Sequence, residues 1–185
     1  MPCFVWTANA AKSALVNSSV DVSKHSPATA IHLPSYALLV VVGAVVAAAD
    51  QITKHLALSR LNDAPIHLID GILSLRLAFN SGGAFGLGQD FPAVFLVATL
   101  VIVAVIFFWV RTVTDRRWIT ALGMVLGGGI GNVSDRIFRD LDGSVVDFVD
   151  LHVWPVFNLA DSAIFLGVVA ILLLGLRTDP DPRDE

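Results

Sequence analysis

Long apolar stretches alternate with short mixed or polar connections along most of this chain. There are four such stretches, at Tyr36–Ala49, Pro92–Val110, Trp118–Ser134 and Val153–Leu176, and the last is interrupted by Asp161. A helix needs roughly 20 residues to cross the ~30 Å hydrocarbon core of a membrane. The charge-free parts of the first, third and fourth stretches are shorter than that, so each can cross fully only by including a polar residue at one end. The pattern predicts four transmembrane helices.

Polar residues adjoin three of these stretches. Asp50 follows the first, Asp135 and Arg136 follow the third, and Asp161 lies near the start of the fourth. If the first helix runs from inside to outside, the third does too and the fourth returns. All three acidic positions then fall at the same, outer, end of the bundle, so the spacing predicts one shared polar face.

Basic residues in the short connections predict the orientation of the helices. Arg111, Arg116 and Arg117 crowd the link between the second and third helices, and Arg177 follows the fourth. Cytoplasmic loops carry an excess of Lys and Arg, so we expect this side, with both chain termini, in the cytoplasm. The bias is modest because the opposite side also carries basic residues, which are Lys54, Arg60, Arg76, Arg136 and Arg139.

The remaining segments complete the predicted organisation. Residues 1–34 mix Ser, Ala, Asn and isolated charges without a sustained apolar run, which predicts a disordered cytoplasmic tail rather than a cleaved secretory signal. Residues 35–177 form the predicted four-helix domain, and residues 178–185 form a polar cytoplasmic tail. The segments IHLIDGILSLRLAF and VVDFVDLHV, in the two outer connections, have the composition and alternation of strands. We therefore predict an all-α membrane protein of four transmembrane helices with a small extracytoplasmic β element.

Composition agrees with a membrane protein and argues against other classes. Of the 185 residues, 55% are hydrophobic and only 15% are charged, and the mean hydropathy of +0.74 is above that of soluble domains. The net charge is −4 without a basic face, so nucleic acid is not an expected partner. Cys3 is the single cysteine, which excludes an intramolecular disulfide, a four-cysteine metal site and a cysteine redox pair.

Several ionisable residues fall at membrane depth, where a charge costs about 2.5–3.5 kcal/mol at a helix centre on insertion scales, so each is a candidate functional residue. Asp50 and Lys54 share a helical face at i, i+4, which suits either a functional pair or an interfacial ion pair that ends the helix. Asn132, Asp135 and Arg136 also share a face, which permits structural hydrogen bonds between helices or contacts to a ligand. The spacing leaves both alternatives open for each group.

The start of the last helix carries an acidic residue with two interpretations. The sequence N-L-A-D from Asn158 to Asp161 matches a helix N-cap with an acidic residue at N3, which alone would account for both residues. A second carboxylate, Asp147, precedes this helix in the outer connection, where the chain can fold back over the bundle. Two facing aspartates share a proton, so one can accept a proton from water while the other donates to a scissile carbonyl oxygen. Such a pair would hydrolyse a peptide bond without a nucleophilic side chain.

Other chemistries fit the sequence less well. The spacing of the serines defines no Ser-His-Asp or Ser-Lys arrangement, although spacing does not exclude one. Asp147, Asp150 and His152 could bind a metal, but the chain has no HExxH-like helix and Phe148–Asp150 resembles a strand. A proton-relay transporter would also place carboxylates in a membrane, but neither inverted repeats nor broken helices are evident. A structural scaffold is the third alternative, and it predicts that single carboxylate substitutions leave function largely intact.

Five short motifs occur in order between Tyr36 and Leu176. They are DQITK, FNSGGAFG, GNVSDR, GSVVDF and FNLADS, which begin at Asp50, Phe79, Gly131, Gly143 and Phe157. This ordered set resembles the motifs of the lipoprotein signal peptidases, also called signal peptidase II. The resemblance implies a four-helix aspartyl endopeptidase of the bacterial inner membrane, without a cofactor. Such an enzyme removes the signal peptide from diacylglyceryl-modified prolipoproteins by cleaving before the lipidated cysteine.

The resemblance also implies roles for single residues. Asp147 and Asp161 would be the catalytic dyad. The residues that line the site and hold the substrate backbone or the dyad would be Asn80, Asn132, Arg136 and Asn158, and the supporting residues would be Asp50, Lys54, Gly82 and Asp135. The expected partners are lipidated prolipoproteins and membrane phospholipid, and the expected inhibitor is the cyclic peptide globomycin. We further expect no metal, and a monomer whose site lies near the extracytoplasmic face.

Overall fold

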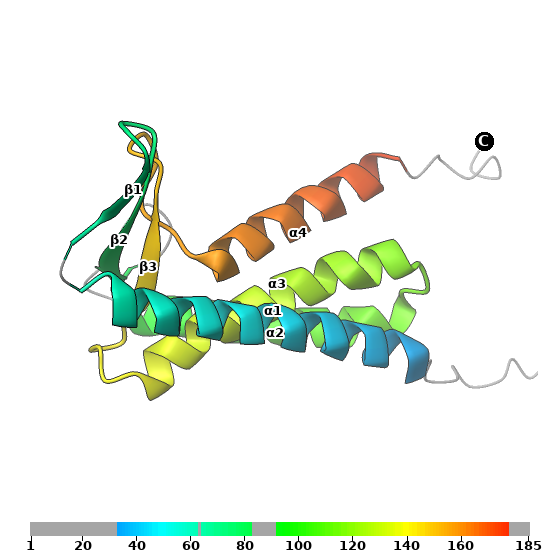
Figure 1. Cartoon of the computed structure of the whole chain (residues 1–185). Coiled ribbons are helices and arrows are strands. Elements are labelled where there is room, and N and C mark those ends of the chain that lie inside the picture. Colours follow the sequence, from blue (N-terminus) through cyan, green and yellow to red (C-terminus); the bar gives the residue numbers. More distant parts are fainter. Residues whose placement is uncertain (1–32, 63, 83–91, 178–185) are drawn as a thin grey trace, which may run out of the picture. The chain divides into compact units, whose positions relative to one another are not determined.

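The computed structural model describes residues 33–62, 64–82 and 92–177. The predicted N-terminal tail up to residue 32, the predicted C-terminal tail and the glycine-rich stretch after Gly82 lie outside the described residues. The described part of the chain is mostly helical and includes a small antiparallel sheet (Figure 1). Its helices are α1 (Leu33–Arg60), α2 (Pro92–Trp109), α3 (Arg116–Phe138) and α4 (Leu159–Leu176), and a 3-10 turn, η2 (Val110–Thr112), follows α2.

The helices have apolar outer surfaces. Ser35–Arg60 and Leu159–Leu176 are each long and apolar enough to cross a membrane, and Leu96–Thr112 is a shorter apolar stretch. Many of their large aliphatic and aromatic side chains face outward, such as Val45 at 63% and Phe165 at 66% exposure. Extensive exposed apolar surface is typical of contact with lipid or with another protein. The predicted fold class is thus confirmed in its coarse form, as apolar helices with a small sheet.

The first helix is longer than its apolar stretch predicted. The prediction extended the apolar stretch only as far as the polar residue at its end, Asp50, which is wrong because α1 continues to Arg60. Asp50 and Lys54 are fully buried. They pair with each other, and Lys54 also pairs with Asp135 of α3, so neither residue has to reach water. The ion pair therefore does not end the helix, and its charged groups lie inside the bundle.

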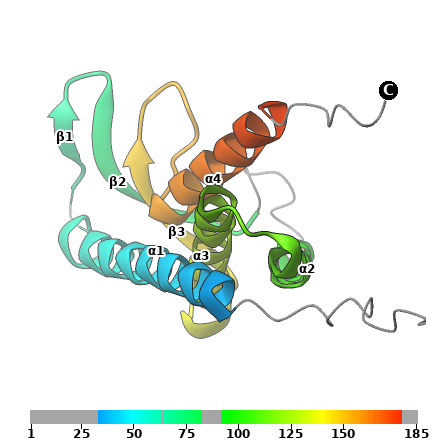
Figure 2. The same cartoon turned by 90° about the vertical axis from the view of Figure 1, so that its right-hand side faces the viewer.

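α3 lies between α1 and α4 and packs closely against both (Figure 2). On the α1 side, a Cβ at Gly127 would lie only 2.5 Å from the Gly43 carbonyl oxygen. On the α4 side, a Cβ at Gly128 would lie 2.5 Å from the Ala160 carbonyl oxygen. Small residues at crossing points let helix backbones approach directly in membrane proteins. The glycines of α3 therefore set the positions of α1 and α4 relative to each other.

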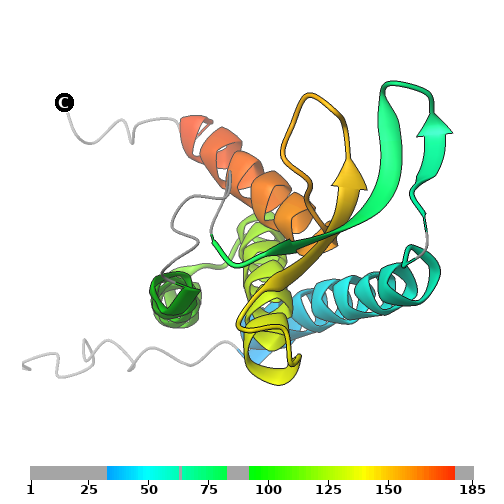
Figure 3. The same cartoon turned by 90° about the vertical axis from the view of Figure 1, so that its left-hand side faces the viewer.

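The strands form one antiparallel sheet at the end of the helices where α1 and α3 finish and α4 begins (Figure 3). In sheet order they are β1 (Ile66–Ile69), β2 (Leu73–Asn80) and β3 (Val145–Asp150). β3 comes from the second connection and pairs with β2, so Asp147 lies opposite Ala78 and Val145 lies opposite Asn80. Both segments that were predicted as strands are confirmed, and their pairing brings Asn80 and Asp147 close together.

The described interior has an apolar end and a polar end. Away from the sheet, residues of three helices form a buried apolar cluster that includes Leu39, Ile106, Ile119 and Leu122. Toward the sheet, most of the largest fully buried side chains are charged or polar, and they include Asp50, Lys54, Asp135, Asp147 and Asn158. Because buried ions require partners, this end must contain a satisfied polar network, and the candidate site lies there.

Candidate functional site

Asp147 lies in the middle of β3 and is only 2% exposed. Its Oδ1 accepts a hydrogen bond from Asn158 Nδ2 at 2.7 Å, and its Oδ2 accepts one from Asn80 Nδ2 at 3.2 Å. Burial raises the pKa of the Asp147 carboxyl to about 7, and the charge of Asp161 acts in the same direction. The two amide hydrogen bonds and the charge of Lys54 oppose this rise in pKa. Asp147 is therefore a carboxyl group that can hold a proton near neutral pH.

Asp161 lies in the first turn of α4, where the predicted capping arrangement is confirmed. Asn158 Oδ1 accepts a hydrogen bond from Asp161 N at 2.8 Å, and Asp161 Oδ2 accepts one from Asn158 N at 3.2 Å. Capping uses only one of the two carboxylate oxygens. The other, Oδ1, accepts a hydrogen bond from Asn132 Nδ2 of α3 at 2.9 Å. Capping therefore does not account for all the contacts of Asp161.

The chain turns back on itself between β3 and α4. Phe157 forms an isolated antiparallel bridge with Val149, and its carbonyl oxygen accepts hydrogen bonds from Phe148 N at 3.1 Å and Val149 N at 2.8 Å. The next residue, Asn158, is the N-cap of α4 and donates to Asp147. This bridge sets the start of α4 beside the middle of β3, so the two predicted catalytic residues come to line the same cavity.

This cavity has a volume of about 960 Å³ and is polar on one side and apolar on the other. Its polar lining includes Asn80, Gly82, Asn132, Arg136, Asp147 and Asp161. Its apolar lining includes Trp154 and Val156 before α4, and Ile164, Phe165 and Val168 on α4. Mostly apolar pockets with a few placed polar groups are typical ligand sites. This one suits a ligand that combines a peptide group with a hydrocarbon chain.

Three amide side chains contact the two carboxylates, and each is held in one orientation by a group that can only donate. The pairs are Asn80 Oδ1 with Gly82 N at 3.0 Å, Asn158 Oδ1 with Asp161 N at 2.8 Å, and Asn132 Oδ1 with Lys54 Nζ at 2.8 Å. A backbone N–H or an ammonium group has no acceptor atom. Each amide must therefore turn its NH2 group toward a carboxylate, and both oxygens of each aspartate accept a hydrogen bond from a fixed N–H donor.

Arg136 enters the cavity from the last turns of α3. Its Nη2 donates to the Gly82 carbonyl oxygen at 2.6 Å, which ties the segment after β2 to α3. Its Nε is buried and has no hydrogen-bond partner among the described residues. An unpaired buried donor is costly, so this N–H requires an acceptor that the described residues do not supply.

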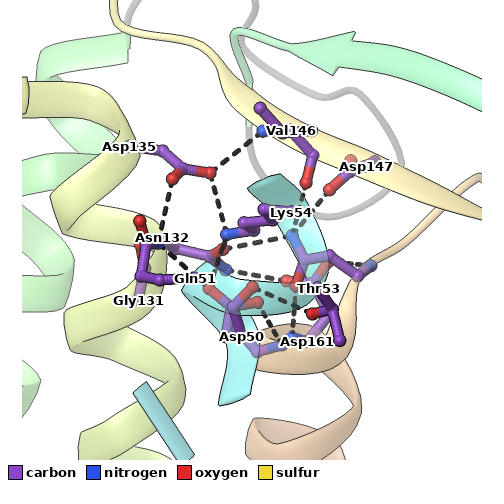
Figure 4. Close-up of polar contacts among 12 residues, drawn as sticks. Asp50, Gln51, Thr53, Lys54, Gly131, Asn132, Asp135, Val146, Asp147 and Asp161 are labelled. Carbon is purple, nitrogen blue, oxygen red and sulfur yellow. Dashed lines mark hydrogen bonds and ion pairs between the residues drawn. The ribbon is translucent and has the colours of Figure 1, made fainter. Parts of the chain in front are cut away.

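Next to the two carboxylates, α1 and α3 share a buried ionic cluster (Figure 4). Lys54 Nζ lies 2.9 Å from Asp50 Oδ2 and 2.8 Å from Asp135 Oδ2. Asp50 Oδ1 also accepts a hydrogen bond from Ala160 N at 2.9 Å, in the first turn of α4. Asp135 Oδ2 accepts one from Val146 N at 3.1 Å, next to Asp147 in β3. The predicted supporting residues thus join the elements that carry the site.

Two members of this cluster were missed in the sequence analysis. Gln51 Nε2 donates to Asp135 Oδ1 and to the Gly131 carbonyl oxygen, both at 3.0 Å. Arg139 Nε donates to Asp135 Oδ1 at 2.7 Å, and its Nη2 donates to Gln51 Oε1 at 3.0 Å. The i, i+4 spacing of Asp135 and Arg139 could have indicated their ion pair. No local signal places Gln51 opposite Asp135.

The alternative metal site at Asp147, Asp150 and His152 is not assembled. Neighbouring side chains of a strand alternate between faces, and Asp150 lies on the other face of β3, where it pairs with Arg76 and accepts a hydrogen bond from His152 N at 2.8 Å. His152 Nε2 lies 2.8 Å from Ser74 Oγ, but Asp150 contacts the backbone of His152 and not its ring. Within the described ranges no group of three or more His, Cys, Asp or Glu side chains could hold a metal ion.

Comparison with known proteins identifies clear relatives. A family profile described as Signal peptidase (SPase) II matches residues 42–177. A lipoprotein signal peptidase of Rhodococcus jostii is 40% identical over 167 residues, which cover 86% of this chain and 84% of that protein. A lipoprotein signal peptidase of Mycobacterium avium is 39% identical over 145 residues, which cover 75% of this chain and 79% of that protein.

Two solved structures of bacterial membrane enzymes share the fold. One has a TM-score of 0.68 at 23% identity and covers 78% of this chain and 94% of its own. The other has a TM-score of 0.67 at 24% identity and covers 77% of this chain and 95% of its own. The arrangement of helices and sheet is therefore that of a known membrane enzyme fold.

Proposed function

Since this chain belongs to the lipoprotein signal peptidase family, signal peptidase II, we propose that Asp147 and Asp161 are its catalytic pair. The protein is a membrane-bound aspartyl peptidase that processes lipoproteins. The observation that carries the proposal is the shared cavity, in which fixed N–H donors hold both oxygens of each aspartate. Both aspartates come from one chain, so a monomer is sufficient for activity.

Asp147 is the member of the pair that is better suited to hold the shared proton. Its pKa is raised to about 7, first by burial and then by the charge of Asp161. Asp161 lies in the first turn of α4, and the N-terminal end of a helix favours a negative charge. Asp161 is therefore the base at the start of the reaction, and Asp147 is the acid.

Hydrolysis by this pair needs no covalent intermediate with the protein. Asp161 takes a proton from water as the water oxygen bonds to the scissile carbonyl carbon, and Asp147 donates its proton to the carbonyl oxygen. As the tetrahedral intermediate breaks down, Asp161 protonates the leaving nitrogen and Asp147 recovers its proton from the hydroxyl group. The C–N bond is broken and both aspartates regain their starting charge. Arg136 lines the same cavity, and its guanidinium group carries N–H donors for the substrate backbone.

The substrate is a prolipoprotein that carries a diacylglyceryl group, and cleavage falls before the lipidated cysteine. The apolar lining on α4, which includes Ile164, Phe165 and Val168, suits hydrocarbon chains. The polar lining at Asn80 and Arg136 suits an extended peptide. In this placement the acyl chains lie along α4 while the peptide passes the two carboxylates.

Cleavage of a lipidated precursor at one bond tests this function. Purified protein in lipid nanodiscs should cut a diacylglyceryl prolipoprotein into two fragments, and mass spectrometry should place the new amino terminus at the lipidated cysteine. The matched control is the same precursor with serine in place of that cysteine, which cannot carry the thioether-linked lipid and should stay intact. Equal cleavage of the control would contradict recognition of the lipid, and a different scissile bond would contradict the proposed placement.

We place all four helices across the bacterial inner membrane with both termini in the cytoplasm. Arg116 and Arg117 begin α3 and Arg177 follows α4, at the end of the helices remote from the sheet (Figure 1). At the same end the rings of Trp109 and Trp118 form an edge-to-face pair 5.6 Å apart. An excess of basic residues is typical of the cytoplasmic side, and Trp is enriched at both membrane–water interfaces. The sheet and the two aspartates then face the extracytoplasmic side.

Reporter fusions test this orientation. A reporter fused after Arg117 or Arg177 should read as cytoplasmic, because the arginines are retained on that side. A reporter inserted in the β1–β2 turn at Gly71 should read as extracytoplasmic. The reverse readings would move the site to the cytoplasmic face and contradict the proposed orientation.

A further inference from the structure

Lys54 takes no part in the reaction described above, yet its ammonium group contacts three side chains while fully buried. Two of the contacts are the carboxylates of Asp50 and Asp135, which neutralise it. The third is the amide oxygen of Asn132 at 2.8 Å. We propose that Lys54 is a positioning residue, which fixes the Asn132 amide so that its NH2 group faces Asp161. The inference rests on the proposed catalytic role of Asp161.

The amide of Asn132 has two possible orientations, which exchange its oxygen and its NH2 group. Asn132 Oδ1 accepts from Lys54 Nζ at 2.8 Å and from Asn158 Nδ2 at 3.1 Å, while its Nδ2 donates to Asp161 Oδ1 at 2.9 Å. An ammonium group has three donors and no acceptor. A flipped amide would therefore set donor against donor at Lys54 and oxygen against oxygen at Asp161. The position of Lys54 excludes that orientation.

The hydrogen bond from Asn158 holds the Asn132 amide less firmly than the bond from Lys54 does. The NH2 group of Asn158 has its shortest hydrogen bond to Asp147 Oδ1 at 2.7 Å, and its contacts with Asn132 Oδ1 and the Val146 carbonyl oxygen are longer, at 3.1 and 3.4 Å. The Asn132 oxygen in turn helps to hold Asn158 against Asp147. Lys54 thus acts on Asp161 through the amide of Asn132, and on Asp147 through the amides of Asn132 and Asn158.

The contacts around Lys54 differ from those that charge balance alone requires. Asp135 has further partners in Arg139 and Gln51, and Asp50 has a further partner in Ala160 N. Two carboxylates are more than enough to balance the charge of one ammonium group, and they take up two of its three N–H donors. The third donor is directed away from them, toward the amide that contacts Asp161.

A matched pair of double variants separates positioning from charge balance. Loss of Lys54 alone would leave two carboxylates with one fewer cation, and breaking a buried ion pair in this way is strongly destabilising. Replacement of Lys54 together with Asp50→Asn removes one positive and one negative charge at the same time. Asp135 then keeps its ion pair with Arg139, and the new amide at position 50 keeps an oxygen for Ala160 N. The two variants are Lys54→Met with Asp50→Asn and Lys54→Gln with Asp50→Asn.

Met and Gln have side chains of the same length, and only Gln offers an N–H donor to the Asn132 oxygen. Both double variants should insert into the membrane and melt at closely similar temperatures. The Gln variant should keep a kcat at least about tenfold higher than the Met variant, because displacement of catalytic groups costs rates of that order or more. A merely structural role would not separate two equally stable variants.

The comparison of kcat is made at the pH optimum of each variant. Both variants lose the charge of Lys54, which lowers the pKa of Asp147, so the fall in rate above about pH 7 should move to higher pH in both. The charge of Asp50 is lost in both variants too, whereas Arg136 and Asp135 on α3 and the two aspartates themselves are unchanged. Because the same two charges are removed in both variants, the pH shift is common to them, and the difference in kcat reports the hydrogen bond to Asn132.

Equal kcat values for the two double variants would overturn the proposal, whatever their level. Failure of both variants to fold would also overturn it, because Lys54 would then serve the fold. The Asn variants of the catalytic pair distinguish this failure from failure of the proposed function. If the Asn variants of the catalytic pair are inactive while the two double variants have equal kcat values, only the proposed role of Lys54 is wrong. If the Asn variants remain active, the assignment of the catalytic pair is itself wrong.

Discussion

Replacement of either Asp147 or Asp161 by Asn should reduce cleavage of a lipidated prolipoprotein by about 10²–10⁴-fold. Asn keeps the size and much of the hydrogen-bonding shape of the side chain but cannot release or take up the shared proton. Because the two groups act as a unit on one proton, the double variant should be little worse than either single variant. The measurement is the rate of fragment release by each purified variant, with a thermal melt to show that the fold persists.

The result for Asp161 separates catalysis from helix capping. If Asp161 only caps α4, Asn at this position would cost about 1 kcal/mol of stability and leave most of the activity. Asp150→Asn is the matched control, because Asp150 lies on the same strand as Asp147 but pairs with Arg76 away from the cavity. Its activity should stay near that of the wild type. An Asn variant at either catalytic position that kept more than about a tenth of the activity would remove that residue from the mechanism.

Gly127→Ala should destabilise the helical bundle by about 1–3 kcal/mol, the usual cost of overpacking. The added Cβ would lie 2.5 Å from the Gly43 carbonyl oxygen and 2.7 Å from Val46 Cβ. A helix backbone cannot turn aside as a side chain can, so α1 and α3 would have to separate. Separation would also pull Lys54 away from Asp135, so cleavage should fall together with the melting temperature.

Gly175→Ala is the matched control for this prediction. Gly175 lies near the end of α4, and a Cβ there would meet only the ring of Trp118, at an ordinary distance of 3.8 Å. Ala is favoured over Gly in a helix by about 1 kcal/mol, so the melting temperature should stay constant or rise. Thermal melts of both variants in the same detergent make the comparison. A Gly127→Ala protein as stable as the wild type would contradict the close approach of α1 and α3.

Much of the fold follows from patterns within short segments. The apolar stretches at Pro92–Val110 and Trp118–Ser134 correspond to α2 and α3, and the alternation in VVDFVDLHV corresponds to β3. The N-L-A-D sequence forms the capping box at the start of α4. Each of these features depends on residues a few positions apart, and for that reason the sequence predicts them. The ordered motifs likewise indicated the family before any geometry was known.

The ends of the elements were harder to predict. α1 continues to Arg60 because Lys54 finds partners on α3 and Asp50 finds one at the start of α4, and a pattern confined to α1 contains no information about those partners. Gln51 was overlooked for the same reason, since its contacts are with Asp135 and the Gly131 backbone. A charged residue in an apolar segment can end a helix or enter a buried network, and only its neighbours in space decide between the two.

The candidate site depends on contacts between segments far apart in the chain. The sequence offered Asp147 and Asp161 as a pair, but a strand and a helix start can be arranged in many ways. The bridge between Val149 and Phe157 and the amide of Asn158 bring them to one cavity. The orientation of each surrounding amide is set by the donors that packing places beside its oxygen. The residue types in the sequence therefore indicate the kind of reaction, while tertiary packing decides which atoms face each other.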